Sequence, residues 1–211
     1  MKKDKIRKGL FGILYFVIVF MTIGMSVYGV RQDRNQKEIA EKILRFHVRA
    51  NSDSREDQEL KLKVRDAVGT LMSEKLKEAE DKKMCRDIVK EHMQEIIHTA
   101  EQVIAEEGYD YPVSAYVSDV DFPVKTYGSY TFPAGEYEAL EVVIGAGMGR
   151  NWWCVMYPNM CFEGSVYEVE DAHAKRALKK ALTEEEYESL LTDKEHEISF
   201  KYFGFLDKYL K

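Results

Sequence analysis

The sequence IGAGMGRNWWCVMYPNMCF, residues 144–162, constrains its own backbone path more than any other part of the chain. It contains both tryptophans, two of the three cysteines, one of the four prolines and three closely spaced glycines. Glycine loses more backbone entropy on ordering than other residues, and a buried indole needs a partner for its N–H. We therefore expect this stretch to follow one specific path. It could carry chemistry, lock the fold or contact another protein.

The segments before this stretch and within it predict a small α+β domain. Two amphipathic helices, over residues 55–78 and 82–107, have apolar residues at steps of three and four. Alternating patterns and short apolar runs predict four strands, over 44–48, 112–121, 137–144 and 152–157. The alternation in the first strand is typical of a strand that is half-buried. The order β-α-α-β-β-β favours an antiparallel or mixed sheet.

The charged region after Gly164 is predicted to be helical. Thr183 is followed three residues later by Glu186, which is the pattern of a capping box. We expect helices over 171–182 and 183–191.

The N-terminal segment is typical of a signal peptide or a membrane anchor. Five of the first eight residues are basic, and residues 9–30 follow without a charge. At about 1.5 Å per residue, a helix of this length spans a bilayer core of about 30 Å. Basic residues before the apolar run predict a cytoplasmic N-terminus and an exported body. Small residues at Gly24, Ser26 and Gly29 suit a signal peptidase, so cleavage and retention both remain open.

These features divide the chain into four regions: a leader (1–30), a short linker or helical stalk (31–42), a core domain (43–163) and a charged helical tail (164–211). The whole chain has a net charge of −6, and because residues 1–30 contribute +4, the remainder carries −10. An acidic body argues against nucleic-acid binding, which needs a basic face for the phosphates.

Export also affects the interpretation of the cysteines, because thiols outside the cytoplasm tend to form disulfides. Cys154 and Cys161 are close in sequence, with Pro158 between them, and we expect them to form a disulfide. Cys85 is then the unpaired cysteine. Two buried thiols are the alternative to this disulfide.

The glycines and histidines do not match a cofactor or metal site. Gly145, Gly147 and Gly149 have the spacing GxGxG, and Trp152 follows where a dinucleotide loop would begin a helix. A hairpin loop with positive φ is the simpler interpretation. The five histidines lack the spacing of metal ligands. We therefore expect no cofactor, no metal and no small-molecule substrate.

An exported thiol hydrolase is the alternative function. Cys154 would be the nucleophile, His47 its base and Asp53 the group that orients the base. A lone histidine on a strand is more often structural, and Cys161 is available to pair with Cys154. We therefore favour a protein that is not an enzyme.

Several long motifs resemble the stage II sporulation protein R family. They occur in the family's order between residues 43 and 163: FHVRANSDS (46–54), FPVKTYG (122–128), PAGEYEAL (133–140) and the stretch 149–161. The resemblance implies a signal made in the forespore and exported into the space between the septal membranes. There it would trigger a membrane-embedded aspartic protease of the mother cell to process pro-sigma-E. It brings no catalytic residues.

The surface that would bind this protease is predicted from the aromatic residues. Rigid aromatic side chains and arginine are frequent anchors at interfaces. We expect the contact to include Arg150, Trp152, Trp153, Tyr157 and Tyr127. The N-terminal segment would provide the contact with the membrane.

Overall fold

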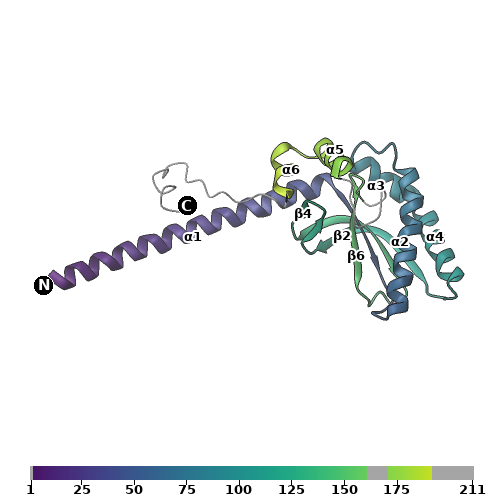
Figure 1. Cartoon of the computed structure of the whole chain (residues 1–211), viewed down its shortest axis with the longest axis horizontal. Coiled ribbons are helices and arrows are strands. Elements are labelled where there is room, and N and C mark those ends of the chain that lie inside the picture. The colour runs from purple at the N-terminus through teal and green to yellow at the C-terminus, as the bar shows by residue number, and fades with distance from the viewer. Residues whose placement is uncertain (1, 161–170, 192–211) are drawn as a thin grey trace.

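A computed structural model describes residues 2–160 and 171–191 of the chain (Figure 1). The α+β class is confirmed, with an apolar N-terminal helix that projects from the body. In chain order the elements are α1 (Lys2–Lys42), β1 (Leu44–Arg49), α2 (Arg55–Lys75), α3 (Lys82–Glu91), α4 (Met93–Glu106), β2 (Val113–Phe122), β3 (Lys125–Tyr127), β4 (Tyr130–Phe132), β5 (Gly135–Ile144), β6 (Asn151–Tyr157), α5 (Asp171–Ala181) and α6 (Glu184–Leu190).

The main sheet is mixed and has the strand order β2-β5-β1-β6. β1 is parallel to β5 and antiparallel to β6, and β5 is antiparallel to β2. The strands β3 and β4 form a separate two-stranded sheet. All four predicted strands are present within one or two residues of their expected bounds.

The predicted order of elements differs from the structure in two places. The helix expected over 82–107 is interrupted at His92, which is the C-cap residue of α3 and the N-cap residue of α4. No glycine or proline marks this break, and the apolar spacing continues on both sides of it. The hairpin of β3 and β4 is also additional, because strands of three residues are too short to show a period of two.

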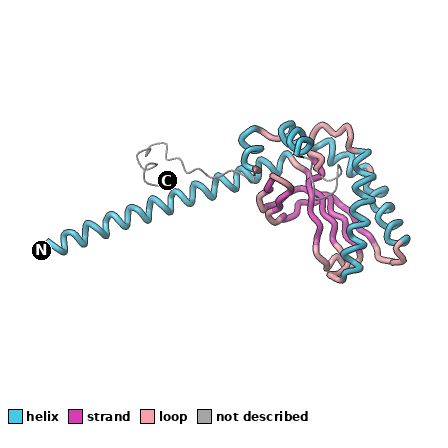
Figure 2. Tube along the Cα trace, in the orientation of Figure 1, coloured by secondary structure: helices cyan, strands magenta, loops and turns pink. Residues whose placement is uncertain are grey.

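One face of the sheet packs on helices. Alternation along β1 places Leu44, Phe46 and Val48 on this face, where all three are fully buried. Figure 2 shows α2 and α4 together on that side of the sheet. The predicted helical stripes supply much of this core: Leu60, Val64, Val68, Met72, Val89, Ile96, Ala100 and Ile104.

The other face of the sheet carries Arg45 and His47, and both are fully buried. The prediction of a half-buried first strand is therefore wrong. A second core covers this face with residues from α1, the β3–β4 hairpin and the C-terminal helices: Ile39, Ile43, Tyr130, Phe132, Leu178, Leu182, Tyr187 and Leu190. These partners come from both ends of the chain, and the local alternation along β1 carries no information about them.

α1 is continuous from the leader into the body, so the helical form of the predicted stalk is confirmed. Gln36 is almost fully buried and donates from Nε2 to the carbonyl oxygen of Glu136, at 3.0 Å. Among the described residues, one helix, α1, is long and apolar enough to cross a membrane. The apolar part of α1 is not buried against the body. A signal sequence meets the same criterion.

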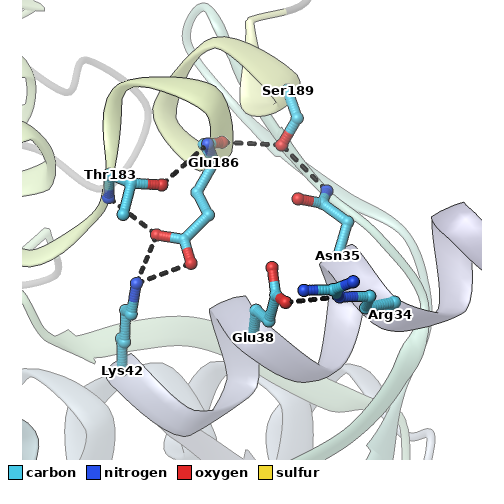
Figure 3. A network of polar contacts seen from close by, with 7 residues as sticks. All are labelled: Arg34, Asn35, Glu38, Lys42, Thr183, Glu186 and Ser189. Atoms are coloured by element: carbon cyan, nitrogen blue, oxygen red, sulfur yellow. Dashed lines mark hydrogen bonds and ion pairs between the residues drawn. The ribbon is translucent and has the colours of Figure 1, made fainter.

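The C-terminal helix α6 is attached to the stalk by a polar network (Figure 3). Thr183 and Glu186 form the predicted capping box. Lys42 donates to both carboxylate oxygens of Glu186, at 2.6 and 2.7 Å. Asn35 donates to Ser189 Oγ at 3.0 Å. Burial on its own would raise the pKa of Glu186, but hydrogen bonds from Lys42 and Thr183 lower it below its usual value.

Candidate interaction surface

The loop formed by residues 145–150 passes over the end of β1. β5 and β6 both pair with β1 and lie on either side of it, so the loop joins two strands that are not neighbours. The hairpin predicted here is therefore wrong, because a third strand lies between the two that the loop connects. The positive φ is confirmed, at +58° for Gly145 and +62° for Gly147. We call residues 145–150 the glycine loop.

The turn after β1 holds the glycine loop in place through a series of hydrogen bonds. Backbone N–H groups of Met148 and Gly149 donate to the carbonyl oxygens of Asn51 and Ala50, at 3.1 and 2.9 Å. The N–H of Ala146 donates to Asn51 Oδ1 at 2.9 Å. These bonds satisfy backbone donors that would otherwise depend on water, so the two segments form one rigid unit.

Asp57 stabilises the turn from the first turn of α2. Its carboxylate accepts hydrogen bonds from Asn51 Nδ2 and Ser52 Oγ, at 2.9 and 2.5 Å. Ser54 caps α2 by accepting from the Asp57 N–H at 3.1 Å. Burial alone would raise the pKa of Asp57, but the hydrogen bonds from Ser52, Asn51 and other neighbours lower it. Ser54 is thus the N-cap residue of α2.

The glycine loop presents two long side chains to solvent. Met148 is 83% exposed. Arg150 has a side chain that is 74% exposed, and its Nε lies 3.4 Å from a carboxylate oxygen of Asp53. The backbone N–H of Arg150 also donates to Asp53, at 2.7 Å.

The two tryptophans lie on opposite faces of β6. Trp152 packs edge-on against Phe46 on the helix-covered face, with Arg65 5.1 Å above its ring. Trp153 stacks on His47 on the other face, with 4.9 Å between the ring centroids. Both indoles are half-buried, and a partner that approaches one face of the sheet meets only one of them.

The other predicted contact residues, Tyr127 and Tyr157, lie away from the glycine loop. The Tyr127 hydroxyl donates to the carbonyl oxygen of Trp153 at 2.9 Å, and its ring lies beside Arg45. Tyr157 pairs with Leu44 at the start of β1, the end remote from the loop. The five predicted residues therefore do not form one surface, and Arg150 and Trp152 are those nearest to Met148 along the chain.

Comparison with known proteins identifies the family. The model of the stage II sporulation protein R family matches residues 40–167, which include β1, the glycine loop and β6. The chain belongs to this family. It is 30% identical over 176 residues to stage II sporulation protein R of Bacillus subtilis (strain 168), and the match covers 78% of this chain and 79% of that protein. No solved structure matches the chain.

Membership in the stage II sporulation protein R family supports a role in sporulation signalling. It also supports, indirectly, a protein that is not an enzyme. The apolar helix α1 is compatible with a signal peptide or a membrane segment in such a protein.

The thiol site weighed as an alternative is not assembled in this family member. On β6, Cys154 lies opposite Phe46, whereas His47 lies opposite the neighbouring Trp153. Because successive side chains point to opposite faces, Cys154 and His47 are on different sides of the sheet. Asp53 binds Arg150 instead of His47. This geometry does not support a Cys154–His47–Asp53 triad.

Cys154 and Cys85 are also unsuited to nucleophilic chemistry. Cys154 is buried and disulfide-bonded. Its predicted partner Cys161 lies outside the described residues. Cys85 is free, as predicted, and burial raises the pKa of its thiol to about 12. A thiol with so high a pKa is protonated at neutral pH and is a poor nucleophile.

A buried polar cluster on the second face was missed by the sequence analysis. His47 Nε2 lies 2.7 Å from Glu141 Oε2, although the angle is poor for a hydrogen bond. Tyr116 donates to the other oxygen of Glu141 at 2.7 Å, and Arg49 lies 3.7 Å from that oxygen. Desolvation lowers the pKa of His47 although Glu141 acts to raise it. His47 has no exposed surface, so we interpret the cluster as structural.

No metal site was found in the described part of the chain. Within residues 12–160 and 175–191, whose side chains the structure describes, no group of three or more histidine, cysteine, aspartate or glutamate side chains is arranged to hold an ion. The glycine loop, with its hydrogen-bonded backbone and its exposed Met148 and Arg150, is the candidate interaction site.

Proposed function

We propose that the protein is an exported sporulation signal that activates a membrane-embedded aspartic protease of the mother cell, so that the protease processes pro-sigma-E. The observation that carries this proposal is the family match. It spans residues 40–167, which include most of the folded body, the glycine loop and the turn after β1. The body would lie in the space between the septal membranes. Its apolar helix would either anchor it there or be removed.

The arrangement of the body supports a role in binding. The glycine loop and the turn after β1 are held together by hydrogen bonds and project exposed side chains. A ligand activates a partner when it binds the active state more tightly than the inactive one. A shift from 1% to 99% active needs about 10⁴-fold tighter binding to the active state. A rigid surface supports tight binding because little entropy is lost on association.

Reconstitution in a host that does not sporulate tests this proposal. The full chain is co-expressed with the protease and pro-sigma-E, and cleavage of pro-sigma-E is measured by immunoblot. We expect cleavage only when all three proteins are present. A matched control lacks the body and keeps residues 1–42, and it should not activate. A second control lacks residues 1–30, remains in the cytoplasm and should also be inactive. Cleavage that is independent of the full chain would refute the proposal.

A further inference from the structure

Met148 has the most exposed large apolar side chain of the described body. Outside α1, the other large apolar residues with substantial exposure are Val124 at 58%, Tyr116 at 44% and Met84 at 40%. A single exposed apolar residue is common on protein surfaces and carries little information alone. Met148 differs because its backbone is fixed.

Each backbone N–H group from residue 145 to residue 150 donates a hydrogen bond within the protein. Gly145 and Gly147 donate to the carbonyl oxygens of Pro112 and Ile144, at 2.8 and 3.1 Å. Met148 itself donates to Asn51 at 3.1 Å. The backbone of the loop is therefore ordered, although the side chain of Met148 at its tip is exposed and does not pack in the core. A preorganised apolar side chain of this kind is typical of an anchor at an interface.

We propose that Met148 is an anchor residue that inserts into an apolar pocket on the extracytoplasmic part of the membrane-embedded protease, with a carboxylate at the pocket rim that binds Arg150. This inference rests on the proposed function and assigns the surface that performs it. Methionine suits the role because its unbranched thioether adapts to an irregular pocket and makes favourable contacts with aromatic rings.

The charges beside Met148 indicate an acidic rim. Arg150 ends the loop, and the Arg49 side chain, which also lies 3.7 Å from Glu141, approaches Gly147. The pair of Arg150 with Asp53 is long and solvent-exposed, so it is weak and Arg150 can exchange its partner at low cost. These arginines are presented by a body with an excess of acidic residues. A carboxylate on the partner could therefore pair with Arg150 beside Met148.

The position of the loop favours a protein over the membrane to which α1 would be attached. A single residue separates α1 from β1, and the six residues of β1 lead to the turn that holds the loop. Six strand residues cover roughly 20 Å. Met148 therefore lies at the end of β1 remote from α1, where a neighbouring protein domain can reach it.

Substitutions at Met148 test the inference in the reconstituted system. We expect Met148→Ala to reduce pro-sigma-E cleavage at least tenfold and Met148→Glu to abolish it. Thermal unfolding should be unchanged, because the side chain is exposed. Arg150→Glu should also reduce cleavage, and Arg150→Lys should reduce it less. The matched controls Val124→Ala and Val124→Glu alter an exposed apolar residue elsewhere on the body and should retain wild-type cleavage.

The outcomes separate this inference from the proposed function. If the wild-type chain does not activate the protease, the proposed function fails. If the wild type activates and Met148→Glu activates equally well, the anchor is wrong while the function stands. A photo-crosslinking amino acid at position 148 should link the full chain to the protease, and one at position 124 should not. Crosslinking from position 148 to lipid or to a second copy of the chain, without crosslinking to the protease, would overturn the inference.

Discussion

The backbone carbonyl group of Ser52 occupies the space that a side chain on Gly149 would need. A Cβ at this position would lie against both atoms of the carbonyl, nearer than real Cβ atoms are found. The two nearest atoms belong to the backbone of Ser52, and the added Cβ is itself fixed by the backbone of residue 149. No side-chain rotation can therefore relieve the clash. The turn after β1 and the glycine loop therefore fit together only when residue 149 is glycine.

Gly149→Ala should consequently destabilise the protein. We expect a loss of about 1–3 kcal/mol, the usual cost of adding a methylene-sized group to a well-packed site. Urea unfolding of the full chain in detergent micelles measures it. Met148→Ala, one residue earlier in the same loop, is the control and should leave the unfolding midpoint unchanged. A midpoint for Gly149→Ala equal to that of the wild type would show that the loop is not packed as described.

Arg45 provides a second prediction, because its buried guanidinium is surrounded by aromatic rings. It lies 4.4 Å from the ring centroid of Phe122 and 5.1 Å from those of Phe132 and Tyr137. Its hydrogen bond to the Tyr127 hydroxyl, from Nη2, is 3.2 Å long. No ion pair joins Arg45 to a carboxylate among the side chains that the structure describes, those of residues 12–160 and 175–191. Desolvation lowers the pKa of this arginine.

Arg45→Lys should destabilise the protein more than Arg45→Met does. An ammonium is more strongly hydrated than a guanidinium and does not stack on rings, so we expect a loss of about 2 kcal/mol or more. Methionine removes the buried charge while it keeps much of the volume, so we expect a change within about 1 kcal/mol. Chemical unfolding of the two variants decides the order. The reverse order would mean that the cationic charge itself stabilises the second core.

His47 should make the stability of the protein depend on pH. Its pKa is lowered from 6.5, first by desolvation and further by Arg49 and Arg45, against the opposing effect of Glu141. The unfolded chain therefore binds the proton more readily than the folded protein. The stability associated with neutral His47 is complete above about pH 6.5 and is lost as the pH falls towards the folded pKa.

The measurement is the unfolding free energy at pH 7.5, 6.5 and 5.5. The wild type should lose stability across this range, and His47→Gln should show a flatter profile even if it is less stable at every pH. The exposed pair of His92 with Glu95 supplies a control, and His92→Gln should leave the profile steep. Identical profiles for His47→Gln and the wild type would count against this assignment.

Two ion pairs between α1 and α6 differ mainly in their burial and allow a matched comparison. Lys42 binds Glu186, whose side chain is 5% exposed, whereas Arg31 binds Glu185 and both of their side chains are 77% exposed. Lys42→Ala leaves a nearly buried carboxylate without its cation, and we expect it to destabilise the docking of α6 by about 1–2 kcal/mol. Arg31→Ala should change it by less than about 0.5 kcal/mol. Hydrogen exchange of the α6 amides measures both variants, and equal exchange would contradict the docking shown in Figure 3.

The sequence predicts those elements whose signals are local. The stripe from Leu60 to Met72 defines α2, and the Thr183–Glu186 capping box defines the start of α6. The signals fail where the partner is distant. The charge of Arg45 suggests a solvated position, and it is buried because aromatic residues from β2, β4 and β5 surround it.

The candidate site follows the same rule. The three glycines correctly mark a constrained loop, but its neighbour in space is the turn at 51–54, almost one hundred residues earlier. The pairing of β1 with both β5 and β6 is what brings the two together. Met148 has no distinguishing sequence signal, because exposure and a fixed backbone are properties of the assembled loop. The aromatic residues predicted for the contact are partly buried, Trp152 and Tyr157 against the first core and Tyr127 and Trp153 against the second.

Because α1 is one continuous helix, it fixes the orientation of the body relative to the apolar segment. When the apolar part of α1 lies in a bilayer, only the stretch between Val30 and the docked Gln36 separates the bilayer from the body, roughly 8 Å of helix. The number of residues in this stretch then sets the rotation of the body about the axis of α1 as well as its height above the bilayer. One inserted residue would turn the body by about 100° and raise it by about 1.5 Å, whereas seven would raise it by about 10 Å and nearly restore its heading. In a membrane-tethered form, α1 would thus fix both the height of the body above the bilayer and the direction in which the body faces.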